Sequence, residues 1–181
     1  GMDNNYIFQY WEAIQDGTVT VGKWIKTIYE ILVNGLKSGK WDFDEEKANK
    51  AINFIENFCH HSEGRNDLLK LELWQKAIVS AIFGIMDKRT GYRQFREVFI
   101  VVARKNGKTL FAAAIAAYMA YIDGEYGAKV YFLAPKLDQA DLVYDAFYQI
   151  VQADDEVDSI TKKRRSDIYI KEFNTSVKKI A

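Results

Sequence analysis

The sequence predicts an α/β fold: a parallel β-sheet built on a strand–helix–strand unit, preceded by an all-helical N-terminal region. Two observations carry this prediction. Apolar residues recur at helical spacing through roughly the first 90 residues. Beyond Phe95, continuous β-branched and aromatic runs alternate with segments of helical pattern. We therefore expect a helical region over residues 2–92 and a sheet-containing region over residues 93–181.

Four helices are expected in the N-terminal region, and each should bury one apolar face. Asp42 or Asp44 can cap the third helix, and the fourth should end before Gly91. The apolar positions of the four faces, helix by helix, are Tyr6, Tyr10, Trp11 and Ile14; Trp24, Ile25, Ile28, Ile31 and Leu32; Ala51, Ile52, Ile55, Phe58 and Cys59; and Trp74, Ala77, Ile78, Ala81, Ile82 and Ile85.

The second region begins with residues 98–102, a run typical of a strand that is buried on both faces of a parallel sheet. A helix over residues 109–122 should follow, then a buried strand at Lys129–Leu133 and a helix over residues 136–151. This order predicts parallel pairing of the two strands with a right-handed crossover.

The C-terminal segment places an acidic run at residues 154–158 before a basic run at residues 162–165. Ile168–Ile170 and residues 177–180 are expected to form a short hairpin that could cover one edge of the sheet. The basic run either contacts DNA phosphates or is a solvated loop, and its composition fits both.

The composition excludes several classes of protein. Lys plus Arg and Asp plus Glu both number 25, so a uniformly basic nucleic-acid coat is excluded, although a local basic patch is not. Cys59 is the single cysteine, which rules out an intrachain disulfide and fits a reducing, cytosolic compartment. No apolar run reaches the ~18 residues that a membrane-spanning helix needs, and the N-terminus does not resemble a secretory signal.

Residues 103–109, which join the first long strand to its helix, have the chemistry of a phosphate-binding loop. Gly107 allows the backbone N–H groups to approach an anion, and Lys108 offers a mobile cation to the terminal phosphates. Thr109 offers a hydroxyl to Mg²⁺. The following helix presents its positive N-terminal end to the same anion.

The loop departs from the usual pattern, because Val102 stands where the first glycine belongs. Gly-Lys-Thr alone is a weak signal, and the strand before it with the helix after it is what favours a nucleotide site over an ordinary turn. Arg104 and Lys105 add two cations to the loop. Arg104 is either a group that stabilises charge in the transition state or a solvated side chain, and the same alternatives hold for Lys105.

The run Arg104-Lys105-Asn106-Gly107-Lys108-Thr109 resembles the deviant Walker A motif of phage terminase large subunits, in which an arginine early in the loop replaces the glycine-rich start. Leu73-Trp74-Gln75 is similar to the adenine-contacting motif of that family. Residues 20–24, 41–44, 51–56 and 134–140 are similar to further segments of the family, the last at a position that related helicases use to couple to DNA.

The resemblance implies an ATPase that uses Mg²⁺ and packs double-stranded DNA into an empty capsid. It implies that Trp74 and Gln75 contact adenine and that the loop residues Arg104, Lys105, Asn106, Gly107, Lys108 and Thr109 bind the nucleotide. Within the loop, it implies that Thr109 holds Mg²⁺ and that Arg104 and Lys108 act in catalysis. It also implies a portal protein and a small terminase subunit as partners, a homo-oligomeric motor, and the host cytoplasm as location.

One expected element is missing. A P-loop ATPase needs a Walker B strand that ends in Asp and is usually followed by Glu, and no such pattern follows Thr109. In the family this element and a nuclease domain lie further along the chain, so we expect the 181 residues alone to hydrolyse ATP poorly or not at all. The alternatives are a helicase-like P-loop ATPase, and a non-catalytic module whose helical half docks on the portal or the small subunit.

Overall fold

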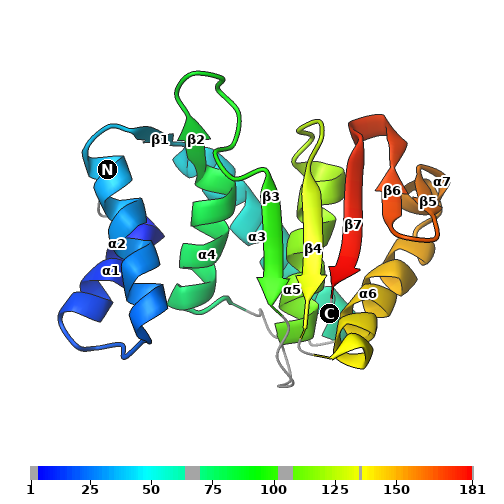
Figure 1. Ribbon diagram of the computed structural model, residues 1–181, viewed down its shortest axis with the longest axis horizontal. Coiled ribbons are helices and arrows are strands. Elements are labelled where there is room, and N and C mark those ends of the chain that lie inside the picture. The colour runs from blue at the N-terminus through cyan, green and yellow to red at the C-terminus, as the bar shows by residue number, and fades with distance from the viewer. Residues whose placement is uncertain (1–3, 64–69, 102–107, 135, 181) are drawn as a thin grey trace. The chain divides into compact units, whose positions relative to one another are not determined.

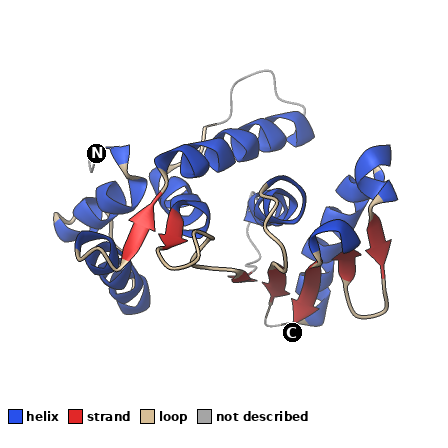
Figure 2. Cartoon of the chain, turned by 90° about the horizontal axis from the view of Figure 1, so that it is seen from above, coloured by secondary structure: helices blue, strands red, loops and turns tan. Residues whose placement is uncertain are grey.

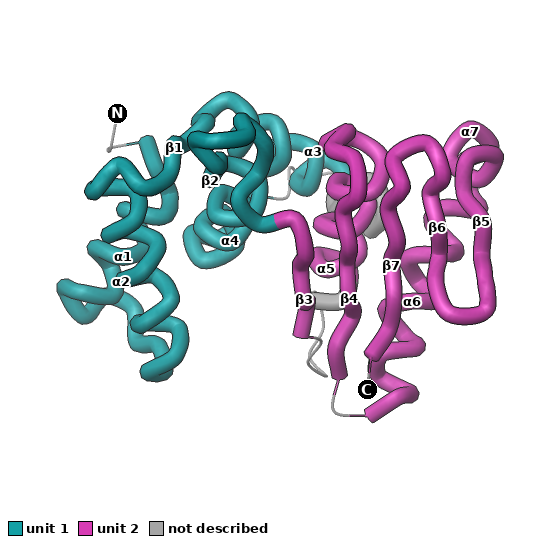
Figure 3. Tube along the Cα trace, turned by 45° about the horizontal axis from the view of Figure 1, so that its top comes forward, with its two compact units in different colours: residues 1–60, 64–95 teal, residues 61–63, 96–181 magenta. Residues whose placement is uncertain are grey.

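The computed structural model describes residues 4–63, 70–101, 108–134 and 136–180, without the side chains of residues 59–63, 108 and 109. It forms two compact units (Figure 3). The first comprises residues 1–60 and 64–95, and the second comprises residues 61–63 and 96–181.

The first unit is mostly helical. Its elements are α1 (Tyr6–Gln15), α2 (Lys23–Lys37), β1 (Trp41–Phe43), α3 (Glu45–Glu63), α4 (Leu73–Gly84) and β2 (Ile85–Asp87). Helices α1 and α3 each begin at a capping side chain. The Asn5 side chain accepts the N–H of Ile7 at 2.9 Å, and the Asp44 carboxylate accepts the N–H of Lys47 at 3.0 Å. Asp44, one of the two predicted caps, is therefore the residue that starts α3.

The core of the first unit forms where α1 packs between α2 and α4. Its buried residues are Ile7, Tyr10, Ile14, Tyr29, Leu32, Val33, Ala77, Ala81 and Ile85. The predicted face of α2 is wrong in most positions. Trp24 is 79% exposed and Ile28 and Ile31 are about half exposed, whereas Tyr29 packs edge-on against Tyr10 with ring centroids 5.0 Å apart. The apolar face of α2 is wider than the surface that α1 covers. Periodicity alone therefore does not predict which apolar side chains of α2 are buried.

The fourth predicted helix is shorter than expected, because the residues at its predicted C-terminal end form a strand instead. α4 ends at Gly84, and Ile85 starts β2, which pairs antiparallel with β1 in the register Phe43↔Ile85. The Phe43 ring lies so close to Gly84 that a Cβ there would meet it at 2.6 Å. The N-terminal region is therefore not all helical, and the correction depends on a long-range strand pairing that local pattern does not reveal.

The second unit is an α/β layer. Its elements are β3 (Glu97–Val101), α5 (Lys108–Ala117), the π-helix η2 (Tyr118–Ile122), β4 (Lys129–Leu133), α6 (Leu137–Gln152), α7 (Asp155–Ser159), β5 (Thr161–Lys163), β6 (Ile168–Ile170), the 3₁₀-helix η3 (Lys171–Phe173) and β7 (Thr175–Ile180). The sheet order is β3-β4-β7-β6-β5 (Figure 1). β3, β4 and β7 are parallel, and β6 is antiparallel to both of its neighbours. The predicted α/β class is confirmed, but the sheet is mixed and not wholly parallel.

Helices α5 and α6 lie on one side of this sheet (Figure 2). Val98, Val130, Phe132 and Val177 are buried on the helix side. On the other side Phe99 is 56% exposed and stacks on Tyr131 with ring centroids 4.6 Å apart. The prediction that the strand at residues 98–102 is buried on both faces is therefore wrong for the described residues 98–101, since β3 alternates like a half-buried strand.

The predicted C-terminal hairpin is present as β6 and β7, which pair in the register Ile168↔Val177. Asn174 takes the left-handed conformation, with φ of 47°, just before β7 begins. β7 also pairs in parallel with β4, so the hairpin does cover an edge of the strand–helix–strand unit. The acidic run forms the short helix α7, and the basic run supplies β5 and the turn after it.

Candidate functional site

The predicted phosphate loop lies between two well-defined elements of the second unit. β3 ends at Val101 and α5 begins at Lys108 (Figure 1). Arg104, Lys105, Asn106 and Gly107 lie outside the described residues, as do the side chains of Lys108 and Thr109. The strand before the loop and the helix after it, on which the interpretation of the loop depends, are thus both present.

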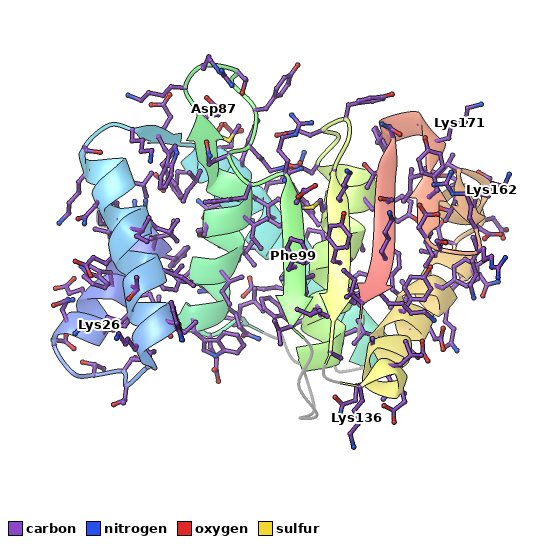
Figure 4. The ribbon with its side chains drawn as sticks, viewed as in Figure 1. Lys26, Asp87, Phe99, Lys136, Lys162 and Lys171 are labelled. Carbon is purple, nitrogen blue, oxygen red and sulfur yellow. The ribbon has the colours of Figure 1, made fainter. Side chains whose placement is uncertain are left out.

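The parallel strands end together at this junction. Val101 of β3 is in register with Leu133 of β4, and Leu133 is in register with Ile180 of β7. The segments after β3 and β4 therefore leave the same edge of the sheet, where open α/β sheets bind their ligands. Lys136, the exposed N-cap residue of α6, lies at this edge (Figure 4).

Helix α5 is packed tightly in the second unit. Residues 111–117 are all buried, four of them as alanines with at most 3% exposure. Small side chains allow α5 to pack closely against α6, its main helical neighbour. The positive N-terminal end of this buried helix lies at the carboxyl edge of β3 (Figure 1).

Trp74 and Gln75, the predicted adenine contacts, belong to the first turn of α4 in the first unit, whereas the phosphate loop belongs to the second. Both are tied to Glu72. The Gln75 side-chain oxygen accepts the Glu72 N–H at 2.8 Å, and the Trp74 indole N–H donates to the Glu72 carboxylate at 2.6 Å. Glu72 therefore orients both side chains. Sequence reasoning missed this role because a capping box usually begins with Ser, Thr, Asp or Asn, whereas here Glu72 takes that position.

Residues 73–180 match the protein family described as the ATPase domain of the terminase large subunit. The chain belongs to this family. The terminase fold is also seen in the comparison with solved structures, where the chain is similar to the crystal structure of the HK97 bacteriophage large terminase with a TM-score of 0.51. Sequence identity is 21% over 75% of this chain, and the matched part spans 27% of that terminase. A search of curated proteins found no match.

The match includes the β3–α5 junction and the Trp74-Gln75 pair, so both predicted motifs lie in the terminase ATPase region. Among the residues that the structure describes, no group of three or more His, Cys, Asp or Glu side chains is placed to hold a metal ion. Over the same residues, no helix is long and apolar enough to cross a membrane.

Proposed function

We propose that this chain is the ATP-binding part of a terminase motor that couples ATP hydrolysis to translocation of double-stranded DNA into a capsid. The observation that carries the proposal is that β3 ends at Val101 and α5 begins at Lys108, because Gly107-Lys108-Thr109 falls at this strand-to-helix transition in the sequence. In this arrangement loop amides, a lysine and a helix N-terminus serve one anion. Membership of the terminase ATPase family supports it.

Each loop residue has a role in the proposal. Lys108 neutralises the terminal phosphates, and Thr109 supplies a hydroxyl ligand to Mg²⁺. The backbone of Lys105, Asn106 and Gly107 surrounds the phosphates. Arg104 stabilises the charge that develops on the transferred phosphoryl group.

Adenine recognition is proposed for Trp74 and Gln75. Because the Gln75 oxygen already accepts the Glu72 N–H, the Gln75 amide NH₂ is the group best placed to donate to a ring nitrogen of adenine. Glu72 then acts as a positioning residue that holds the amide in one orientation. Its replacement by Ala is expected to weaken ATP binding through Gln75 and Trp74 together.

The partners are proposed at the level of the family: double-stranded DNA, a portal protein, a small terminase subunit and further copies of the chain in the working motor. The host cytoplasm is the proposed location. We expect the 181 residues alone to bind ATP and to hydrolyse it weakly or not at all, because no apolar strand ending in Asp-Glu follows Thr109.

The test is a titration of the protein with Mg-ATP, comparing wild type with Lys108→Ala and with Lys26→Ala. Loss of a charge-assisted contact of about 1.5–3 kcal/mol predicts that Lys108→Ala raises Kd by roughly 10- to 100-fold. Lys26 is exposed on α2 (Figure 4) and provides a control of equal charge, so its replacement should leave Kd unchanged.

Equal weakening by both variants would mean that overall charge, and not the loop, holds the nucleotide. Absence of ATP binding in wild type and in both variants would favour the docking-module alternative. The exposed apolar residues Trp24, Ile28 and Ile31 of α2 are the observation that favours this alternative. A helicase-like ATPase, the remaining alternative, would also bind ATP through Lys108. It would differ in showing no packaging activity when assembled with a portal.

A further inference from the structure

A basic cavity of about 640 Å³ lies at the β5–β6 end of the sheet, within the second unit. Lys162, Arg164, Tyr169, Lys171 and Glu172 contribute to its lining. Five basic and two acidic side chains occur between residues 159 and 172, although the whole chain has no net charge. The hairpin is therefore a local concentration of positive charge, and Figure 4 shows Lys162 and Lys171 at this end of the sheet.

Arg164 shapes the cavity but does not supply its available charge. Its guanidinium donates two hydrogen bonds to the Asp167 carboxylate, at 2.7 and 2.6 Å. The backbone N–H of Arg164 donates a third to the Asp167 carbonyl oxygen, at 2.8 Å. Asp167 is only 4% exposed. These contacts close the turn between β5 and β6 and neutralise Arg164, so the hairpin is ordered before any ligand binds.

Among the basic residues that line the cavity, Lys162 and Lys171 are the available cations. Both are exposed, and neither forms an ion pair with a carboxylate of the described residues. Lys162 is in register with Tyr169 and shares its side of the hairpin. Lys163, the next residue, points to the other side, where its ammonium lies 4.7 Å from the centre of the Tyr148 ring. Strand alternation thus separates one lysine of the cavity from one that packs on α6.

The remaining groups of the cavity indicate what kind of anion fits. One face of the Tyr169 ring is covered by the Arg164 guanidinium at 4.1 Å, and the Tyr169 hydroxyl donates to the Asn174 side chain at 2.9 Å. The Ser159 hydroxyl donates to the Glu156 carbonyl oxygen at 2.7 Å. The cavity therefore offers ammonium groups, while Arg164 already occupies one face of the one aromatic ring in its lining. This chemistry suits the phosphates of a duplex better than the unstacked bases of a single strand.

We propose that Lys162 and Lys171 bind backbone phosphates of double-stranded DNA, independently of sequence. The choice of DNA as the polyanion rests on the proposed function. Glu172, the one acidic residue that lines the cavity, lies next to Lys171 and opposes binding by like-charge repulsion.

The test measures binding of a fluorescent DNA duplex of about 30 base pairs by anisotropy over a series of salt concentrations. Each lysine that contacts a phosphate releases about one counterion, which corresponds to roughly tenfold in affinity at about 0.1 M salt. The Lys162→Ala/Lys171→Ala double variant should therefore bind on the order of 100-fold more weakly, and the slope of log K against log salt should fall by about 2. Glu172→Gln should bind DNA more tightly than wild type.

Lys163→Ala is the matched control, because it removes the same charge from the same strand on the side that faces α6. It should leave the affinity and the salt slope nearly unchanged. Lys162→Arg/Lys171→Arg should retain binding, which separates lost charge from a damaged hairpin. The proposal is overturned if the double Ala variant binds DNA like wild type, if Lys163→Ala loses as much, or if a single strand of equal length binds more tightly than the duplex.

The same variants are titrated with Mg-ATP, so that the two proposals fail separately. One outcome is that ATP binding depends on Lys108 while DNA binding is unchanged when Lys162 and Lys171 are replaced. This outcome would overturn the hairpin site and leave the ATPase proposal standing. DNA binding that depends on both lysines, without any ATP binding, would support the hairpin site and count against the ATPase proposal.

Discussion

The Tyr121 hydroxyl lies 2.7 Å from the Thr161 hydroxyl and joins η2 to β5. Thr161 donates its own proton to the Val157 carbonyl oxygen at 2.7 Å, so Tyr121 is the donor of the pair. η2 continues the helix that follows the phosphate loop, and β5 begins the basic hairpin. Burial raises the pKa of Tyr121 to about 12, so the phenol keeps its proton throughout the physiological range. One hydrogen-bonded connection therefore links the elements that carry the two proposed sites.

Tyr121→Phe is expected to lower the free energy of unfolding by about 1 kcal/mol, the usual net contribution of an intramolecular hydrogen bond. The ring should keep its stacking on Phe147, whose centroid lies 6.4 Å away. Urea unfolding of Tyr121→Phe, Thr161→Val and the double variant would measure the coupling between the two hydroxyls. Strictly additive losses would contradict the contact.

Asp167 should make stability depend on acid pH. Its hydrogen bonds from Arg164 hold the pKa of this carboxyl below its ordinary value. A lowered pKa in the folded state stabilises the fold above the unfolded value of about 3.9, and this contribution is lost as pH falls through the folded value. Because Arg164 is 45% exposed, we expect Asp167→Asn to cost only about 1 kcal/mol at pH 7.

The measurement for Asp167 is chemical unfolding of wild type and Asp167→Asn between pH 7 and pH 2. The difference between the two proteins should shrink steadily below about pH 4, since the wild-type carboxyl then becomes neutral as well. A difference that stays constant over this range would show that the ion pair is not its source.

Gly35→Ala should destabilise the first unit. A Cβ at Gly35 would lie 2.4 Å from the Trp41 ring, so the ring or the helix must shift. Overpacking of this kind costs about 1–3 kcal/mol. The control is Gly22→Ala, because no atom lies within 4 Å of a Cβ built there, and it should cost at most about 0.5 kcal/mol. Thermal unfolding of both variants is the measurement, and equal losses would contradict the close approach of Trp41.

Phe99 and Phe132 test whether one face of the sheet is open. Phe132 is fully buried on the helix side, so Phe132→Ala should cost about 3–5 kcal/mol. Phe99 is 56% exposed and loses mainly its stacking on Tyr131, so Phe99→Ala should cost at most about 1.5 kcal/mol. Urea unfolding compares the two. A loss for Phe99→Ala as large as that for Phe132→Ala would show that this face is covered in solution.

Prediction from sequence succeeded where the signal is local. β4 has the predicted bounds Lys129–Leu133, and α6 differs from its prediction by one residue at each end. It failed where a contact from elsewhere in the chain decides the outcome. Ile85 continues the helical pattern of α4, yet its pairing with Phe43 makes it a strand residue. Trp24 fits an apolar face of the helical pattern, yet its side chain is 79% exposed.

The sequence by itself determined the strand-to-helix junction around Gly107-Lys108-Thr109 and the family to which the chain belongs, because both depend on short runs of residues with particular chemistry. Only the tertiary structure decided that Lys162 and Lys171 share a cavity while Lys163 does not, and that Arg164 is neutralised by Asp167. Strand pairing and burial set these relationships. A run of basic residues in a sequence does not show which of its side chains lie on the same face of a strand, because that depends on where the strand begins and how it pairs.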